Sequence, residues 1–576
     1  MMLFEVWVPE KTVKLLVAGE ERAMERGDDG WWRLSVDAGP GSDYAFVLPD
    51  VDSPLPDPRS PWQPAGVHGP SRVYDHAAFG WTDQAWTGKQ LPGSILYELH
   101  IGTFTAEGTF DAAIERLDHL VGLGVDLVEL LPVNAFNGSH NWGYDGVCWY
   151  APHEPYGGPD GLKRFVDAAH ARGLGVVLDV VYNHFGPSGA YAPMFAPYLS
   201  KHGANPWGDS INLDGPLSDE VRRYIADNVL MWLRDYHVDG LRLDAVHALV
   251  DHSAVHLLEQ LAVAVESLSA HLGRPLSLIA ESDLNDPRLI TPREAGGFGL
   301  TAQWDDDVHH ALHTLLTGER QGYYGDFGSL DCLQTVLEGA FFHAGTWSSF
   351  RRRHHGRPVD RLRTPGHRFV AFLQNHDQIG NRAIGDRISA SLSPGLLKVG
   401  ATLLLTGPFT PMLFMGEEWA ASSPWQFFTS HPEPELADAV RTGRRREFAA
   451  HGWHSADVPD PQDPATFERS KLDWDELGKP GHAEILALYR RLIALRRQYP
   501  DLSDPWLSRV EVWHGDNYVV IRRGGCLVAA NLAPVPQTVS LRSVPSKVLL
   551  ATSPGVVLQR DRVELPAESA VVVAAR

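Results

Sequence analysis

Short apolar runs alternate with longer amphipathic stretches from Ile95 to about Arg497, and this alternation restricts the fold more than any other feature of the sequence. Apolar runs followed by helical stretches are typical of parallel βαβ units, which close into a barrel or form a doubly wound sheet. Eight runs are of strand type: Ile95–His100, Asp126–Leu131, Gly175–Val181, Asp239–Asp244, Leu276–Glu281, Leu300–Gln303, Phe369–Gln374 and Pro411–Met415. Because a TIM barrel has eight strands, we predict an α/β fold of the (β/α)₈ type.

Short β-type segments flank the alternating region on both sides. Residues 31–36 lie among Gly, Asp and Pro turns, and after Pro505 similar runs return at 518–521 and 570–573. Such segments are typical of small β-domains. We therefore predict an N-terminal β-sandwich over residues 1–87, a (β/α)₈ barrel with loop insertions over 88–500, and a C-terminal β-sandwich over 501–576.

The charge of the chain disfavours one class of partner. A formal net charge of -22 argues against nucleic-acid binding, which depends on clustered Lys and Arg.

The most apolar stretch, residues 399–415, is interrupted by Pro408 and Pro411, so we predict no membrane span. No glycine-rich phosphate loop follows a strand, and we predict no cofactor. Protein partners are not indicated.

The cysteine and histidine patterns give two further expectations. The three cysteines are widely spaced, and Met1–Trp7 lacks the basic start of a signal peptide, so we expect a cytoplasmic protein. Adjacent histidines such as His309 and His310 point apart on a helix and make a poor chelating pair. No calcium loop is present either, and we predict no metal site.

Four predicted strands end on or just before a carboxylate. These residues are Asp179, Asp244, Glu281 and Asp377. A single acid at a strand end is most often a helix cap or a loop ion pair. Four acids on one rim indicate a functional site, because like charges gathered in a pocket raise the free-energy cost of ionising each carboxyl group. In a (β/α)₈ barrel this rim holds the active site.

The acids at the ends of the fourth and fifth strands, Asp244 and Glu281, are predicted to have different roles. Arg242 and Asp244 are two residues apart on a strand and therefore share a face, so the arginine keeps Asp244 ionised. Glu281 ends an apolar strand beside negative neighbours, which raises its pKa and keeps it protonated. One nucleophile and one proton donor fit glycoside hydrolysis with retention.

Four segments closely resemble the signature regions of the α-amylase family, glycoside hydrolase family 13, in order and spacing. They are residues 179–184, 240–247, 279–282 and 372–377. The resemblance implies that Asp244 is the nucleophile, Glu281 the proton donor and Asp377 the transition-state stabiliser. It also implies that the sugar in the reacting subsite is held by Asp179, His184, Arg242 and His376.

Longer motifs are similar to one subfamily within that family. They lie at residues 63–71, 242–248, 302–306, 415–419 and 424–431, and so include the predicted sandwich as well as the barrel. This resemblance implies hydrolysis of the α-1,4 bond next to the terminal trehalose unit of maltooligosyltrehalose or a related α-glucan. It also makes the 1–87 sandwich a carbohydrate-binding-like module.

Other residues near the strand ends are candidate substrate contacts. Tyr144 follows the second strand and can stack on a glucose ring, although a packed loop explains it as well. His247 is expected on the leaving-group side, with helix capping as the alternative. The remaining candidates follow the sixth and seventh strands and are Asp305, Asp306, His309, Gln378 and Asn381.

Two other functions remain open at this stage. A glucan branching enzyme has the same carboxylates but transfers the glycosyl unit to another glucan, so the carboxylates do not separate the two activities. A non-catalytic glucan-binding protein is the second alternative. The intact acids Asp244, Glu281 and Asp377 argue against it.

Overall fold

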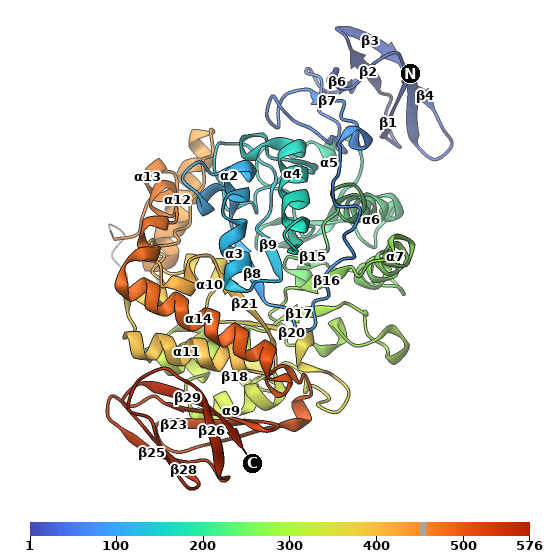
Figure 1. Ribbon diagram of the computed structural model, residues 1–576. Coiled ribbons are helices and arrows are strands. Elements are labelled where there is room, and N and C mark those ends of the chain that lie inside the picture. Colours follow the sequence, from blue (N-terminus) through green and yellow to red (C-terminus); the bar gives the residue numbers. More distant parts are fainter. Residues whose placement is uncertain (450–456, 576) are drawn as a thin grey trace.

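The centre of the molecule is a closed barrel of eight parallel strands, seen in a computed structural model that describes residues 1–449 and 457–575 (Figure 1). The strands are ordered β12-β15-β16-β17-β20-β21-β8-β9. Their bounds are β8 (Leu96–Leu99), β9 (Leu127–Leu130), β12 (Gly175–Val180), β15 (Gly240–Leu243), β16 (Ser277–Ala280), β17 (Ala302–Trp304), β20 (Phe369–Phe372) and β21 (Thr410–Phe414). Each predicted apolar run contains or overlaps one strand, and the predicted (β/α)₈ fold is confirmed.

Every residue of these eight strands is buried. A parallel sheet is covered on both faces, and this is why its strands read as nearly continuous apolar runs. The helices that surround the barrel are α3 (Leu117–Leu123), α4 (Gly158–His170), α6 (Ser218–Asp235), α7 (Leu257–Leu272), α8 (Asp306–Thr317), α11 (Pro394–Thr406) and α14 (Pro480–Gln498). Figure 1 shows α4, α6 and α7 on one side of the strands and α11 and α14 on another.

The remaining helices and several pairs of short strands lie in the connections. The helices are α1 (Ile101–Phe104), α2 (Phe110–Ile114), α5 (Ala192–Phe195), α9 (Leu330–Gly339), α10 (His376–Gly380), α12 (Pro434–Ala449), α13 (Pro464–Arg469) and α15 (Pro500–Ser503). The paired short strands are β10 (Asn134–Ala135) with β11 (Cys148–Pro152), β13 (Leu199–Asn205) with β14 (Gly208–Ile211), and β18 (Thr346–Ser348) with β19 (Arg353–His355).

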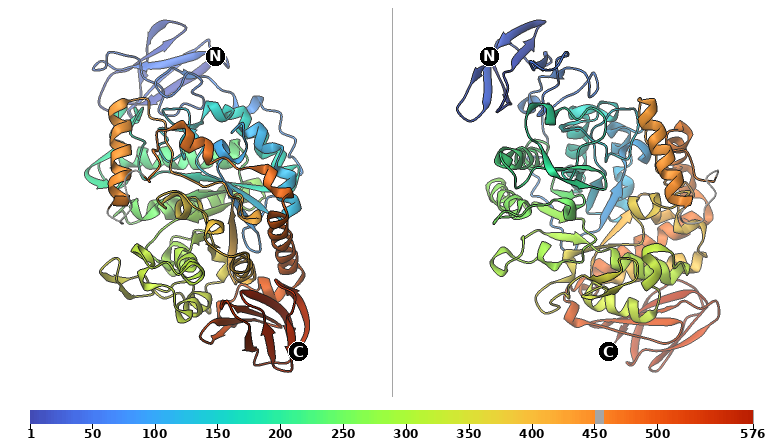
Figure 2. Two further views of the ribbon diagram at one scale, coloured as in Figure 1. Left: turned by 90° about the vertical axis from the view of Figure 1, so that its left-hand side faces the viewer. Right: turned by 180° about the vertical axis from the view of Figure 1, so that it is seen from behind.

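Antiparallel sheets lie at the two ends of the chain. The N-terminal sheets have the orders β1-β5-β4 and β3-β2-β6-β7, and the C-terminal sheets have the orders β22-β23-β24-β29-β26 and β25-β28-β27. Figure 2 shows these two regions on opposite sides of the barrel. The N-terminal strands are β1 (Met2–Trp7), β2 (Lys14–Val17), β3 (Glu20–Ala23), β4 (Glu25–Arg26), β5 (Trp31–Val36), β6 (Asp43–Val47) and β7 (Ser71–Arg72). The C-terminal strands are β22 (Val510–His514), β23 (Tyr518–Arg523), β24 (Cys526–Asn531), β25 (Gln537–Ser540), β26 (Pro545–Ala551), β27 (Val557–Gln559), β28 (Arg562–Leu565) and β29 (Ser569–Ala575).

The segment between β7 and β8 connects the N-terminal sheets to the amino-terminal end of the barrel. The Trp86 indole donates to Asp239, just before β15, at 2.8 Å, and Asp83 pairs with His170 of α4 at 2.8 Å. The domain boundaries at residues 88 and 501 stay predictions. Within the described residues, no helix is both long and apolar enough to cross a membrane.

Candidate active site

A cavity of about 620 Å³ opens at the carboxyl ends of the barrel strands. Eleven of the predicted site residues line it: Tyr144, His184, Arg242, Asp244, His247, Glu281, Asp306, His376, Asp377, Gln378 and Asn381. Asp179 lies directly below, where it is bonded to Tyr144 and Arg242. The strand ends therefore bring together residues that are up to 237 positions apart in the sequence, from Tyr144 to Asn381.

Besides Asp179, two predicted contacts, Asp305 and His309, do not line the cavity. Asp305 is fully buried and caps helix α8, because its Oδ1 accepts from the Val308 amide at 3.3 Å. His309 points into the packed side of α8, where its Nε2 lies 3.0 Å from the Tyr324 hydroxyl. Of the three consecutive acids at the start of helix α8, Asp305 to Asp307, only Asp306 lines the cavity.

Asp244 and Glu281 lie side by side because their strands pair in register. Leu243 is opposite Ala280, so the next residue of each strand lies at the same level of the rim. The Glu281 carboxyl accepts from the Ala245 amide at 2.6 Å, and the Glu281 carbonyl accepts from the Val246 amide at 3.0 Å. The loop after β15 is thus attached to the loop after β16 next to both carboxyl groups.

Arg242 contacts three acids from the floor of the cavity. Its Nη1 donates to Asp244 Oδ1 at 2.7 Å and to both oxygens of Asp179 at 2.8 and 2.9 Å, and its Nη2 is 3.6 Å from Glu281 Oε2. The side chain is only 2% exposed. Its guanidinium lies 4.3 Å from the ring centre of Trp304. Hydrogen bonds between ionised partners are the strong ones, and here they fix the direction of Asp244.

Glu281 is kept in its acid form by its surroundings. Burial raises its pKa well above the ordinary value, and the negative charges of Asp244, Asp306 and Asp377 raise it further, while Arg242 lowers it. The burial effect is the largest. A carboxyl group that stays protonated near neutral pH can donate a proton to a leaving oxygen.

Tyr144, Asp179 and His376 form a hydrogen-bonded wall. The Tyr144 hydroxyl donates to Asp179 at 2.6 Å and lies 2.8 Å from His376 Nε2, and the two rings stack with centres 5.1 Å apart. His376 Nδ1 is 2.5 Å from the buried carboxylate of Glu98. Although burial alone would lower the pKa of His376, Glu98 and Asp377 raise it. His376 can therefore donate from both ring nitrogens, to Glu98 and to Tyr144.

Burial raises the pKa of Asp179 to about 6, while Arg242 opposes this rise. Asp179 is consequently charged at neutral pH only with help from its arginine partner. The buried acid also accepts from Tyr144. A sugar hydroxyl near this pair would find a rigid and polar surface.

The sequence reasoning missed several residues of the cavity wall. Trp207, between β13 and β14, is 50% exposed, and Phe350, between β18 and β19, is 52% exposed. Asp283 and Arg351 form an ion pair of 2.7 Å beside them. Exposed aromatic rings in hairpin loops are the kind of surface that stacks on sugars. Their signal in the sequence is weak, because loops carry no hydrophobic period.

The described part of the chain has no group of three or more His, Cys, Asp and Glu side chains that could hold a metal ion. The chemistry available at this site is that of two carboxyl groups, one hydrogen-bonded to an arginine and one whose pKa is raised by burial. Further acids and aromatic rings surround them.

Comparison with known proteins gives the family. Residues 72–196 match the model of the alpha amylase catalytic domain. A malto-oligosyltrehalose trehalohydrolase from Arthrobacter ramosus is 60% identical over 92% of this chain and 93% of its own length. Another from Saccharolobus solfataricus is 42% identical over 91% of this chain and 90% of its own. A crystal structure of a putative alpha amylase from Salmonella typhimurium, 40% identical, superposes with a TM-score of 0.91 over 100% of this chain and 97% of its own.

A barrel of this kind, with acids at its carboxyl rim and a matching catalytic domain, defines a carbohydrate-active enzyme of the α-amylase type. Within that class, the chain belongs to the malto-oligosyltrehalose trehalohydrolase family. The resemblance seen in the sequence motifs is confirmed. A 1,4-alpha-glucan branching enzyme from Vibrio parahaemolyticus is 31% identical over only 54% of this chain and 48% of its own.

Proposed function

We propose that this protein hydrolyses the α-1,4-glucosidic bond next to the terminal trehalose of maltooligosyltrehalose and releases trehalose with retention at the cleaved carbon. Relatives of 42 to 60% identity over nearly the whole chain are named for this activity. The observation that carries the mechanism is the pair formed by Asp244, bonded to Arg242, and Glu281, kept protonated by burial. Retaining glycosidases need one ionised and one protonated carboxyl group.

The first chemical step forms a bond to Asp244. Its carboxylate oxygen attacks the anomeric carbon of the glucan while the C–O bond to trehalose breaks, and Glu281 gives its proton to the departing oxygen. A β-glucosyl ester of Asp244 and a free trehalose result. Arg242 keeps the attacking oxygen directed toward the sugar, since it donates to the other carboxylate oxygen, Oδ1.

The second step reverses the roles. Glu281, now ionised, removes a proton from water, which attacks the anomeric carbon and breaks the ester bond. The glucan is released in the α configuration after two inversions. Asp377, held by Asn381 Nδ2 at 2.6 Å, binds the sugar more strongly as positive charge develops on the ring.

The other cavity residues are proposed substrate contacts. Tyr144, Asp179, His184, Arg242 and His376 surround the reacting sugar from the side of β12 and α10. The remaining contacts are His247, Asp306, Gln378 and Asn381.

Product analysis tests this function directly. The protein is incubated with maltotriosyltrehalose and, separately, with plain maltopentaose, and the products are separated by chromatography. We expect trehalose and maltotriose from the first substrate and much slower cleavage of the second. New α-1,6 branches without net loss of linkages would indicate a branching enzyme, and no reaction with either substrate would indicate a non-catalytic protein. Asp244→Asn serves as the inactive control.

We further propose a cytoplasmic location. Cys148, Cys332 and Cys526 are buried and unpaired, which suits a reducing compartment. Fractionation of producing cells should recover the activity in the cytosolic fraction. Recovery from the culture medium would contradict this location.

A further inference from the structure

Asp377 lies on a helix of only five residues, α10. So short a helix is not stable by itself, and its position depends on contacts at its two ends. At the first end, the Asn375 side chain accepts from the Gln378 amide at 2.7 Å, and the His376 amide donates to Glu98 at 2.9 Å.

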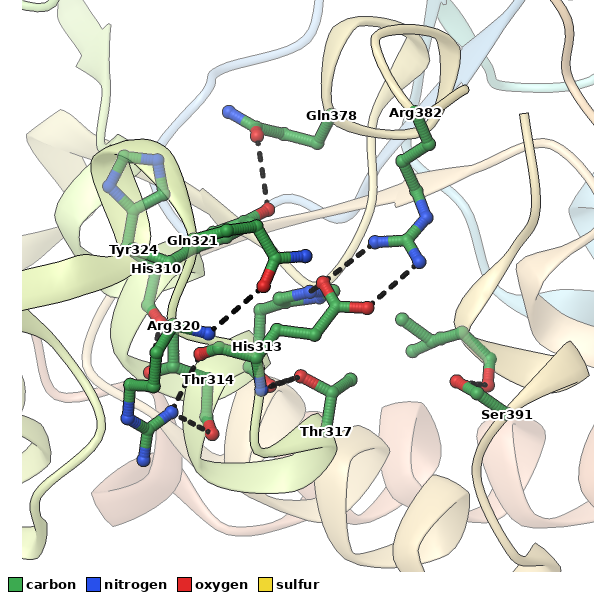
Figure 3. A network of polar contacts seen from close by, with 12 residues as sticks. His310, His313, Thr314, Thr317, Arg320, Gln321, Tyr324, Gln378, Arg382 and Ser391 are labelled. Carbon is green, nitrogen blue, oxygen red and sulfur yellow. Dashed lines mark hydrogen bonds and ion pairs between the residues drawn. The ribbon is translucent and has the colours of Figure 1, made fainter. Parts of the chain in front are cut away.

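Arg382 anchors the carboxyl end of this turn. Its amide donates to the Ile379 carbonyl at 3.0 Å, so it directly continues the turn. Its guanidinium donates two hydrogen bonds to Glu319, from Nη1 at 2.8 Å and from Nη2 at 2.9 Å (Figure 3). Nη2 also donates to Asp386 at 2.8 Å. A bidentate pair of this kind fixes direction as well as distance.

Glu319 is itself held from the opposite side. His313 Nε2 of helix α8 lies 2.8 Å from Glu319 Oε2, and this histidine is 4% exposed. The hydrogen bond from His313 lowers the pKa of the Glu319 carboxyl, and Arg382 lowers it further against the effect of burial. Glu319 thus connects α8 to the turn that carries Asp377.

The segment that contains Glu319 touches the turn a second time. The hydroxyl groups of Tyr323 and Tyr324 both lie near Gln378 Oε1, at 3.2 and 3.5 Å (Figure 3 shows the Tyr324 ring close to the histidines of α8). The Tyr324 ring stacks on His313 with ring centres 4.7 Å apart. Residues 319–324 therefore form a support with two contacts on the Asp377 turn.

The same support begins on the helix that carries Asp306. Asp306 is the first residue of α8 and lines the cavity, and Gln378 Nε2 lies 3.5 Å from its carboxylate. Glu319 and Arg382, both described residues, are absent from the cavity lining and so do not touch a substrate there. Their effect on catalysis is therefore indirect, through the positions of the Asp377 turn and of helix α8.

We propose that Glu319 and Arg382 act as a positioning pair, which holds Asp377 at the distance from Asp306 and Glu281 that the transition state requires. This inference rests on the proposed hydrolysis of maltooligosyltrehalose. Asp377 is proposed to act only as charge develops, so a shift of its turn should slow the chemical step more than it weakens substrate binding. A displacement of about 1 Å at an active site lowers rates by up to about 100-fold.

Steady-state kinetics of Glu319→Ala, Arg382→Ala and the double variant test the pair on maltotriosyltrehalose. We expect each single variant to lower kcat by about 10- to 100-fold with KM changed less than about threefold. The double variant should be no slower than the slower single variant, because the two residues act as one unit. Glu319→Gln keeps an acceptor for one hydrogen bond and should regain part of kcat.

Asp227→Asn is the matched control. It weakens the ion pair between Arg59 and Asp227 at 2.8 Å, in which the arginine is about as buried as Arg382 but the aspartate is more exposed than Glu319, and neither residue lines the active-site cavity. We expect it to lower thermal stability and to leave kcat unchanged. Single variants with normal kcat, or effects that multiply in the double variant, would overturn the positioning pair while trehalose release by the unaltered protein stands. Absence of trehalose release by the unaltered protein would overturn the proposed function instead.

Discussion

Replacement of Arg242 by glutamine tests how the cavity floor holds its acids. The side chain is 2% exposed and donates to Asp179 and Asp244 through one nitrogen, Nη1. Glutamine retains one donor group but neither the charge nor the reach. Asp179 and Asp244 would then be left without the cation that lies between them.

The size of the effect follows from the contacts. Two unit charges about 4 Å apart attract each other by about 4 kcal/mol in the effective dielectric of a protein, and breaking a buried ion pair costs about 3 to 5 kcal/mol of folding free energy. The pKa of Asp179 is already about 6 with the arginine in place. It would rise further in the variant, and Asp179 would take up a proton at neutral pH. Protonation of Asp179 removes one unpaired buried charge, so we expect Arg242→Gln to lower the free energy of unfolding by about 3 kcal/mol, the lower end of this range.

We also expect Arg242→Gln to lower kcat strongly. Loss of one preorganised hydrogen-bond donor lowers kcat by about 100- to 1000-fold, and the Asp244 carboxylate would keep only the side-chain hydrogen bond from Asn183 Nδ2. Trehalose release from maltotriosyltrehalose gives kcat, and urea denaturation gives the free energy of unfolding. Arg274→Gln is the matched control, because Arg274 pairs with the buried Asp239 at 3.0 Å at the opposite end of the barrel. Normal kcat in Arg242→Gln, or an equal loss of kcat in Arg274→Gln, would refute this reasoning.

Three further variants address single groups of the site. Glu281→Gln removes the proton donor and should lower kcat by about 100- to 10,000-fold, with substrates that carry an activated leaving group affected least; equal losses on both kinds of substrate would argue against proton donation. The acid form of Glu281 is lost as pH rises through its raised pKa, so this residue sets the alkaline limb of kcat/KM. Because the negative charge of Asp306 raises the pKa of Glu281, Asp306→Asn should move this limb to lower pH. A shift of the limb to higher pH would be inconsistent with the assignment. Tyr144→Phe removes the hydroxyl between Asp179 and His376 and should lower kcat/KM about 10-fold, since an unpaired buried acceptor costs about 1 to 3 kcal/mol; an unchanged kcat/KM would show that this wall is passive.

The strands and their terminal acids could be predicted because buried strands have a recognisable apolar sequence. A parallel barrel strand is covered on both faces, so an apolar run that stops at Asp244 or Glu281 marks both the strand and its end. The raised pKa of Glu281 followed from the same pattern, since its neighbours are apolar or acidic. Successive strands of the barrel lie side by side, as consecutive βαβ units do.

Other residues lacked such a signal. Glu98 lies inside an apolar run, and its partner His376 is 278 positions away, so nothing local reveals the pair. Asp305 was assigned to the substrate because it follows a strand, but the helix begins one residue later and uses it as a cap. Trp207 and Phe350 lie in hairpin loops, where only the folded chain shows that their rings reach the cavity.

The stereochemistry of hydrolysis tests the central claim most directly. Proton NMR during the first minutes of maltotriosyltrehalose cleavage, before the sugar mutarotates, distinguishes the anomers of the released maltotriose. If Asp244 forms an ester and Glu281 acts first as acid and then as base, the α anomer appears first. Initial appearance of the β anomer would show direct attack by water and would contradict the account of these two carboxyl groups.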